Sequence, residues 1–116
     1  MRTISILFHS AWLLPLSVAA AGAHAFLDHA EPRVGSTVRA APREVSLSFT
    51  QNLEPRFSTV TVTDASGQRV DGGRPVVSGS TMRVPLRGIR PYRVSWRVLS
   101  VDTHTTEGAF TFRVGD

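Results

Sequence analysis

The stretch that decides the fold is YRVSWRVL, residues 92–99. Apolar and polar side chains alternate through it, and successive side chains of a strand point to opposite faces. The alternation therefore predicts a half-buried strand. One face carries the large apolar residues Tyr92, Val94, Trp96 and Val98, and the other carries Arg93, Ser95 and Arg97.

Other segments repeat this pattern on both sides of residues 92–99. Residues 44–50, 57–63, 81–86 and 108–114 each place apolar side chains at every second position, and residues 24–32 and 36–40 are shorter candidates. Turn residues separate them, as in Asp64-Ala-Ser-Gly67 and Asp71-Gly-Gly73. No segment shows a convincing helical period. Short strands at turn-separated intervals predict an all-β Greek-key sandwich of about seven strands.

The first 23 residues have the features of a Sec-type signal peptide. Arg2 precedes a mostly apolar run over residues 4–20, and the small residues Ala21-Gly22-Ala23 follow. A membrane anchor is the alternative, but His9, Ser10 and Pro15 interrupt the run. We expect cleavage after Ala23, export to the periplasm, and a single domain over residues 24–116.

The composition excludes several classes of protein. All 13 basic residues are arginine, and they are scattered rather than clustered, so we do not expect nucleic-acid binding. The chain has no cysteine and therefore no disulfide. No later apolar run approaches the roughly 20 residues that span a bilayer, so we expect no membrane span in residues 24–116.

Cleavage after Ala23 would expose a histidine at the N-terminus. The α-amine and Nδ1 of His24 could then close a chelate ring on one metal ion. In Asp102-Thr103-His104 a carboxylate and an imidazole lie two residues apart, on one face of an extended chain. Adding His104 gives three nitrogens, an arrangement called a histidine brace, and Asp102 can supply an oxygen ligand or an outer contact.

The ligand chemistry favours one Cu(II) ion. Nitrogen and oxygen ligands in a tetragonal arrangement suit Cu(II), which also leads the divalent affinity order. Zinc is the rival, since two histidines and a carboxylate can hold it. A Cu(I) thioether site is not expected, because Met82, the one methionine after residue 23, falls on a core face. Near the site, Glu107 and His29 are candidates for outer contacts, and Asp28 beside His29 offers a weaker further ligand pair.

The sequence resembles the CopC family of periplasmic copper-resistance proteins. The resemblance covers essentially all of residues 24–116. It rests on His24 after the signal, Pro32-x-x-Gly35-Ser36, LSFTQNL at residues 47–53 and YRVSWRVLSVDTHTTEG at residues 92–108. It implies an immunoglobulin-like or cupredoxin-like β-sandwich or barrel that binds Cu(II) through His24, Asp102 and His104. It also implies a partner, an inner-membrane copper-import protein of the CopD type.

Two departures from the family pattern bear on the site. Some members have glutamate at the copper site where this chain has Gln51, which removes a negative charge and leaves Gln51 as an outer contact. Some members carry a methionine-rich loop for Cu(I), but residues 60–80 contain neither Met nor His. We therefore expect a Cu(II) site only, in a protein that buffers or passes on copper for copper tolerance or homeostasis and is not an enzyme.

Two alternative functions remain. A lytic polysaccharide monooxygenase uses a similar histidine brace, but it needs a broad flat surface for its polymer, and most aromatic residues here fall on core faces. A metal-free immunoglobulin-like interaction module would predict that His24 and His104 can be replaced without measurable loss.

Overall fold

The computed structural model describes residues 24–115, so the predicted signal peptide, residues 1–23, lies outside the described residues, as does Asp116. The described part contains strands and one short 3-10 turn, and it has no α-helix. No helix in this part is long and apolar enough to cross a membrane. The elements are β1 Leu27–Glu31, β2 Thr37–Val38, β3 Glu44–Phe49, η2 Pro55–Phe57, β4 Thr59–Asp64, β5 Val76–Ser78, β6 Thr81–Pro85, β7 Pro91–Leu99, β8 Thr105–Thr111 and β9 Arg113–Val114.

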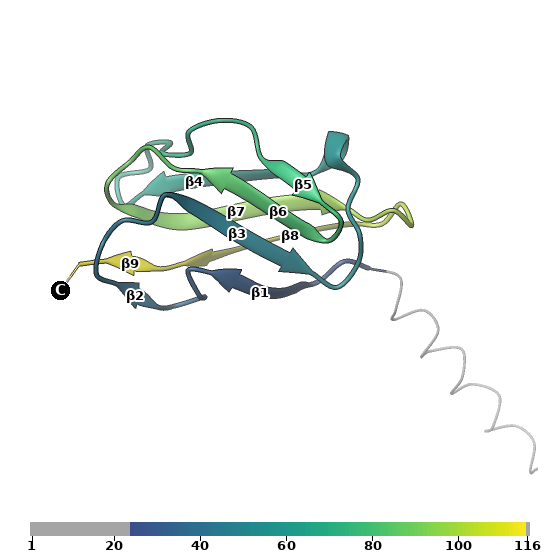
Figure 1. Cartoon of the computed structure of the whole chain (residues 1–116), viewed down its shortest axis with the longest axis horizontal. Helices are drawn as coiled ribbons and strands as arrows, with labels where there is room; N and C mark the ends of the chain where they lie inside the picture. Colours follow the sequence, from purple (N-terminus) through teal and green to yellow (C-terminus); the bar gives the residue numbers. More distant parts are fainter. Residues whose placement is uncertain (1–23, 116) are drawn as a thin grey trace, which may run out of the picture.

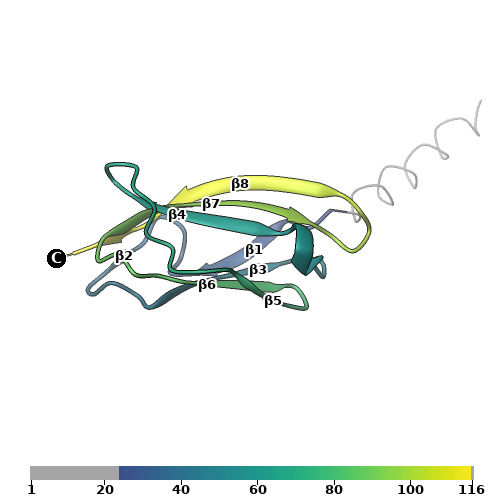
Figure 2. The ribbon, with the colours of Figure 1, turned by 90° about the horizontal axis from the view of Figure 1, so that it is seen from above.

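Two antiparallel sheets pack face to face as the layers of a sandwich (Figures 1 and 2). One has the strand order β1-β3-β6-β5 and the other β4-β7-β8, while β2 and β9 form a small parallel pair. If the seven main strands are lettered in chain order, these sheets read ABED and CFG, which is the constant-type immunoglobulin arrangement. The structure thus confirms the predicted all-β Greek-key sandwich.

The core lies between the two sheets and consists of the alternating apolar residues. Met82, Val94 and Val98 are fully buried. Trp96 is half-buried and reaches across from β7 to Phe49 on β3, with ring centroids 5.2 Å apart in an edge-on arrangement. Arg93 and Arg97 point outward and are exposed, as the alternation predicts. Residues 92–99 therefore fill the core from one face, as expected.

Some strand boundaries differ from the predictions. Phe57 was expected to begin a strand, but it lies in η2, where Pro55 is at the start of the turn, and the residue is 63% exposed. The predicted last strand, residues 108–114, is two strands, and β8 already begins at Thr105. The sequence did not reveal β5, because three residues are too short to show an alternation.

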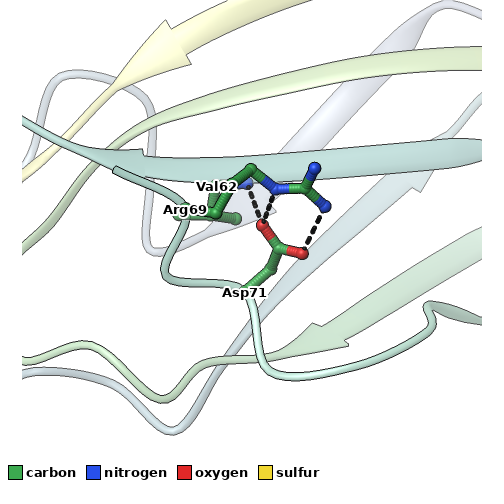
Figure 3. Close-up of polar contacts among 3 residues, drawn as sticks. All are labelled: Val62, Arg69 and Asp71. Atoms are coloured by element: carbon green, nitrogen blue, oxygen red, sulfur yellow. Dashed lines mark hydrogen bonds and ion pairs between the residues drawn. The ribbon is translucent and has the colours of Figure 1, made fainter. Parts of the chain in front are cut away.

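A buried carboxylate fixes the long connection between β4 and β5 (Figure 3). Asp71 is 8% exposed, and one of its oxygens accepts the Val62 backbone N–H at 3.1 Å. Arg69 donates to both of its oxygens at 2.8 Å. These hydrogen bonds, chiefly those from Arg69, hold the pKa of Asp71 below its ordinary value, and Asp71 in turn raises the pKa of Arg69.

The register brings the segment before β1 and the turn between β7 and β8 to one end of the sandwich. Leu27 at the start of β1 lies opposite Phe49 at the end of β3, and Leu99 lies opposite Thr105. A bridge between Leu53 and Ser100 joins the ends of the two sheets. The segment before β1 and the turn between β7 and β8 consequently lie at the same end of the sandwich (Figure 1).

Candidate metal centre

His24 lies in a short segment that is tied to both sheets before β1 begins. The backbone N–H and C=O of Phe26 bond to the side chain and backbone of Thr50, each at 2.9 Å. The Thr106 hydroxyl donates to the Ala25 carbonyl at 2.6 Å, and Ala25 is fully buried. The His24 carbonyl itself accepts from the Thr50 hydroxyl at 3.4 Å. The position of His24 is therefore set by the fold.

His104 ends the tight turn that joins β7 to β8. The Ser100 N–H donates to the His104 carbonyl at 3.0 Å, and the buried Ser100 hydroxyl accepts the His104 N–H at 3.3 Å. Thr103 adopts a φ of 68°, which is uncommon for a β-branched residue and reverses the chain here. Its hydroxyl donates to the Asp102 carbonyl. The turn thereby directs the half-buried His104 toward the start of the described chain.

The two predicted histidines are adjacent. The ring centroids of His24 and His104 are 4.6 Å apart, with 56° between the ring planes. The Nδ1 atom of His104 is buried and has no hydrogen-bond partner within residues 24–115. An unpaired buried polar atom costs roughly 1–3 kcal/mol, and a bound ion is one way to satisfy it. A nitrogen donor that is buried, unpaired and next to a second imidazole fits a metal ligand.

Asp102 does not complete the site in this arrangement. It is exposed in the turn, two residues before His104. Across residues 24–115, no three or more His, Cys, Asp or Glu side chains are arranged so that they could hold a metal ion together. The structure therefore brings together the two histidines, and the role of Asp102 as a ligand stays a prediction.

The residues predicted as outer contacts have partners of their own. The Glu107 carboxylate accepts from Arg97 at 2.8 Å on the exposed face of the β4-β7-β8 sheet. His29 Nδ1 lies 2.9 Å from the Asp28 carboxylate, and both side chains are exposed. Gln51 is half-buried and directly follows Thr50. Thr50 is hydrogen-bonded to the segment carrying His24, so Gln51 is adjacent in sequence to a residue that holds this segment.

Sequence reasoning missed the hydroxyl groups that support the two histidines, namely those of Thr50, Ser100 and Thr106. Threonine and serine are frequent in strands and turns, so neither type nor position distinguishes them. One indication was available for Thr106, which lies only two residues after His104 in the sequence.

Known proteins resemble this chain in sequence and in structure. The sequence model of the CopC domain family matches residues 27–115. Protein YobA of Escherichia coli (strain K12) is 35% identical over 98 residues, covering 79% of each chain. Copper resistance protein C of Escherichia coli is 34% identical over 104 residues, covering 79% of this chain and 82% of the relative.

A solved structure agrees with these matches. The crystal structure of CopC from Methylosinus trichosporium OB3b superimposes with a TM-score of 0.71 at 31% identity, covering 79% of this chain and 94% of the CopC chain. The fold and the sequence match over most of the chain agree with one another. The chain therefore belongs to the CopC domain family.

Proposed function

We propose that this chain is a periplasmic Cu(II)-binding protein that buffers or passes on copper in copper tolerance or homeostasis. The observation that carries the proposal is that the His24 and His104 rings are adjacent. The Nδ1 atom of His104 is buried and has no hydrogen-bond partner among residues 24–115. The family membership and the copper resistance named in a relative support the same conclusion. Copper is the cargo of the protein.

The proposed ligand set contains three nitrogens and one oxygen. Signal cleavage after Ala23 gives His24 a free α-amine beside its imidazole, and His104 supplies the third nitrogen. Asp102 would provide the oxygen from the turn that carries His104. All four groups bind metal in their deprotonated forms, so binding releases protons and weakens in acid. One Cu(II) ion in a tetragonal site is the expected stoichiometry and geometry.

The site is suited to holding and releasing an ion. The two histidines are only half-buried at the tip of the sandwich, where a second protein can reach the metal. The partner we propose is an inner-membrane copper-import protein of the CopD type, which would receive the ion. The protein itself would then carry out no catalysis.

The test is to secrete the full chain from a bacterial host, determine the N-terminus of the exported form by mass spectrometry, and titrate that form with Cu(II). We expect a chain that begins at His24 and binds one equivalent with a tetragonal, nitrogen-rich electron paramagnetic resonance spectrum. A different N-terminus, or no stoichiometric copper, would contradict the proposal. Peroxide formation driven by ascorbate would instead favour the monooxygenase alternative.

A further inference from the structure

Thr106 connects the strand that follows His104 to the segment that carries His24. Its hydroxyl donates to the Ala25 carbonyl at 2.6 Å, a part-buried hydrogen bond. Thr106 lies in β8, and His104 immediately precedes this strand, two residues before Thr106. The start of β8 therefore lies beside one imidazole, and its Thr106 hydroxyl holds the backbone next to the second.

Thr50 holds the same segment from the opposite sheet. It directly follows β3, and its hydroxyl accepts the Phe26 N–H at 2.9 Å. Its own N–H donates to the Phe26 carbonyl at 2.9 Å. The segment around the fully buried Ala25 is therefore hydrogen-bonded to both sheets, to one through Thr106 and to the other through Thr50.

The attachment matters because His24 lies outside the regular strand pairing. The register of β1 begins at Leu27, three residues later. Before this pairing begins, residues 24–26 are held by hydrogen bonds to Thr50 and Thr106 and by the burial of Ala25. Replacing outer groups that orient metal ligands typically lowers metal affinity 10–100-fold.

We propose that Thr106, assisted by Thr50, is a positioning residue for the metal site, which sets the place of His24 through the backbone of Ala25. This inference rests on the proposed copper function. It assigns a role to a side chain that does not touch the metal. Thr106 acts by geometry, so its removal should alter the relation between the two imidazoles even before metal is added.

The test compares Thr106→Val, which keeps the shape and loses the donor, with Thr106→Ser, which keeps the hydroxyl. Thr105→Val, at an exposed neighbouring position, is the matched control. The first readout is metal-free, namely the nuclear Overhauser effect between the ring protons of His24 and His104 in the exported form. The second is Cu(II) affinity by competition with a chelator, together with the electron paramagnetic resonance spectrum.

We expect Thr106→Val to lose the inter-ring effect, to change the copper spectrum and to bind Cu(II) about 10–100-fold more weakly. Thr106→Ser should restore all three, and Thr105→Val should change none. If Thr106→Val does not fold, Thr50→Val removes the other attachment and should weaken the same readouts.

The outcomes separate this inference from the proposed function. Unchanged affinity, spectrum and inter-ring effect in a folded Thr106→Val protein would overturn the positioning role and leave copper binding intact. If the unaltered exported form binds no copper, the proposed function is wrong, and loss of the inter-ring effect in Thr106→Val would still support the positioning of His24.

Discussion

The imidazole rings of His24 and His104 lie with their centroids 4.6 Å apart, although the strands β1 to β7 separate them in the sequence. One precedes the first strand of one sheet, and the other immediately precedes the last main strand of the other sheet. The sandwich thus brings together two nitrogen ligands that lie far apart in the sequence.

His104→Ala should lower Cu(II) affinity by orders of magnitude, because it removes the buried, unpaired Nδ1 of the ring that lies beside His24. Each factor of ten corresponds to about 1.4 kcal/mol of binding free energy. His29→Ala is the matched control, since the His29 side chain is 65% exposed and already lies against Asp28. Competition titration with a chromophoric chelator measures both variants. Equal losses in the two would argue against the assigned ligand.

Gly108→Ala should destabilise the sandwich. A Cβ at this position would lie 2.5 Å from Cζ2 of Trp96, which is held against Phe49. Overpacking of this kind typically costs about 1–3 kcal/mol. The change in the free energy of unfolding can be measured by urea denaturation. At Gly73 an added Cβ meets only Pro85 at 3.6 Å, so Gly73→Ala should have little effect, and a loss of equal size there would contradict the steric explanation.

Asp71→Asn should reduce stability at neutral pH by roughly 1–3 kcal/mol, because Arg69 loses the carboxylate that both of its donors contact. The folded-state pKa of Asp71 lies below the ordinary value of 3.8. Its contribution is therefore complete well above pH 3.8 and is lost as the pH falls below that value toward the folded-state pKa.

Unfolding curves at a series of pH values check this prediction. The stability difference between the unaltered protein and Asp71→Asn should be largest near neutrality and should shrink below about pH 4. Glu107→Gln is the control, because the Glu107–Arg97 pair is exposed and surface pairs contribute little. A difference that grows in acid would contradict the assignment.

Much of the fold followed from the alternation of apolar and polar residues. Residues 92–99 and 44–50 show it over seven or more positions, so their strands and inward faces could be predicted. The three residues of β5 could not show it. Phe57 illustrates the other limit, since Pro55 imposes a turn where a strand was predicted to begin.

The candidate site was predictable where ligand chemistry singled out the residue. Histidine is uncommon, so His24 at a predicted cleavage point and His104 in the Asp-Thr-His sequence were identified, and the structure places them together. Thr50 and Thr106 act through hydrogen bonds to backbone atoms of residues 24–26, and such pairings depend on how the two sheets meet. That relation is tertiary and could not be predicted from local sequence.

The central claim is that the free α-amine and the ring of His24 hold Cu(II) together with His104. The most direct measurement is a Cu(II) titration, by electron paramagnetic resonance, of two chains that differ only in one extra glycine before His24. The extension keeps every side chain and removes the chelate formed by the terminal amine. We predict that it weakens Cu(II) binding by orders of magnitude and changes the nitrogen-rich spectrum, whereas equal affinity and identical spectra would contradict the claim.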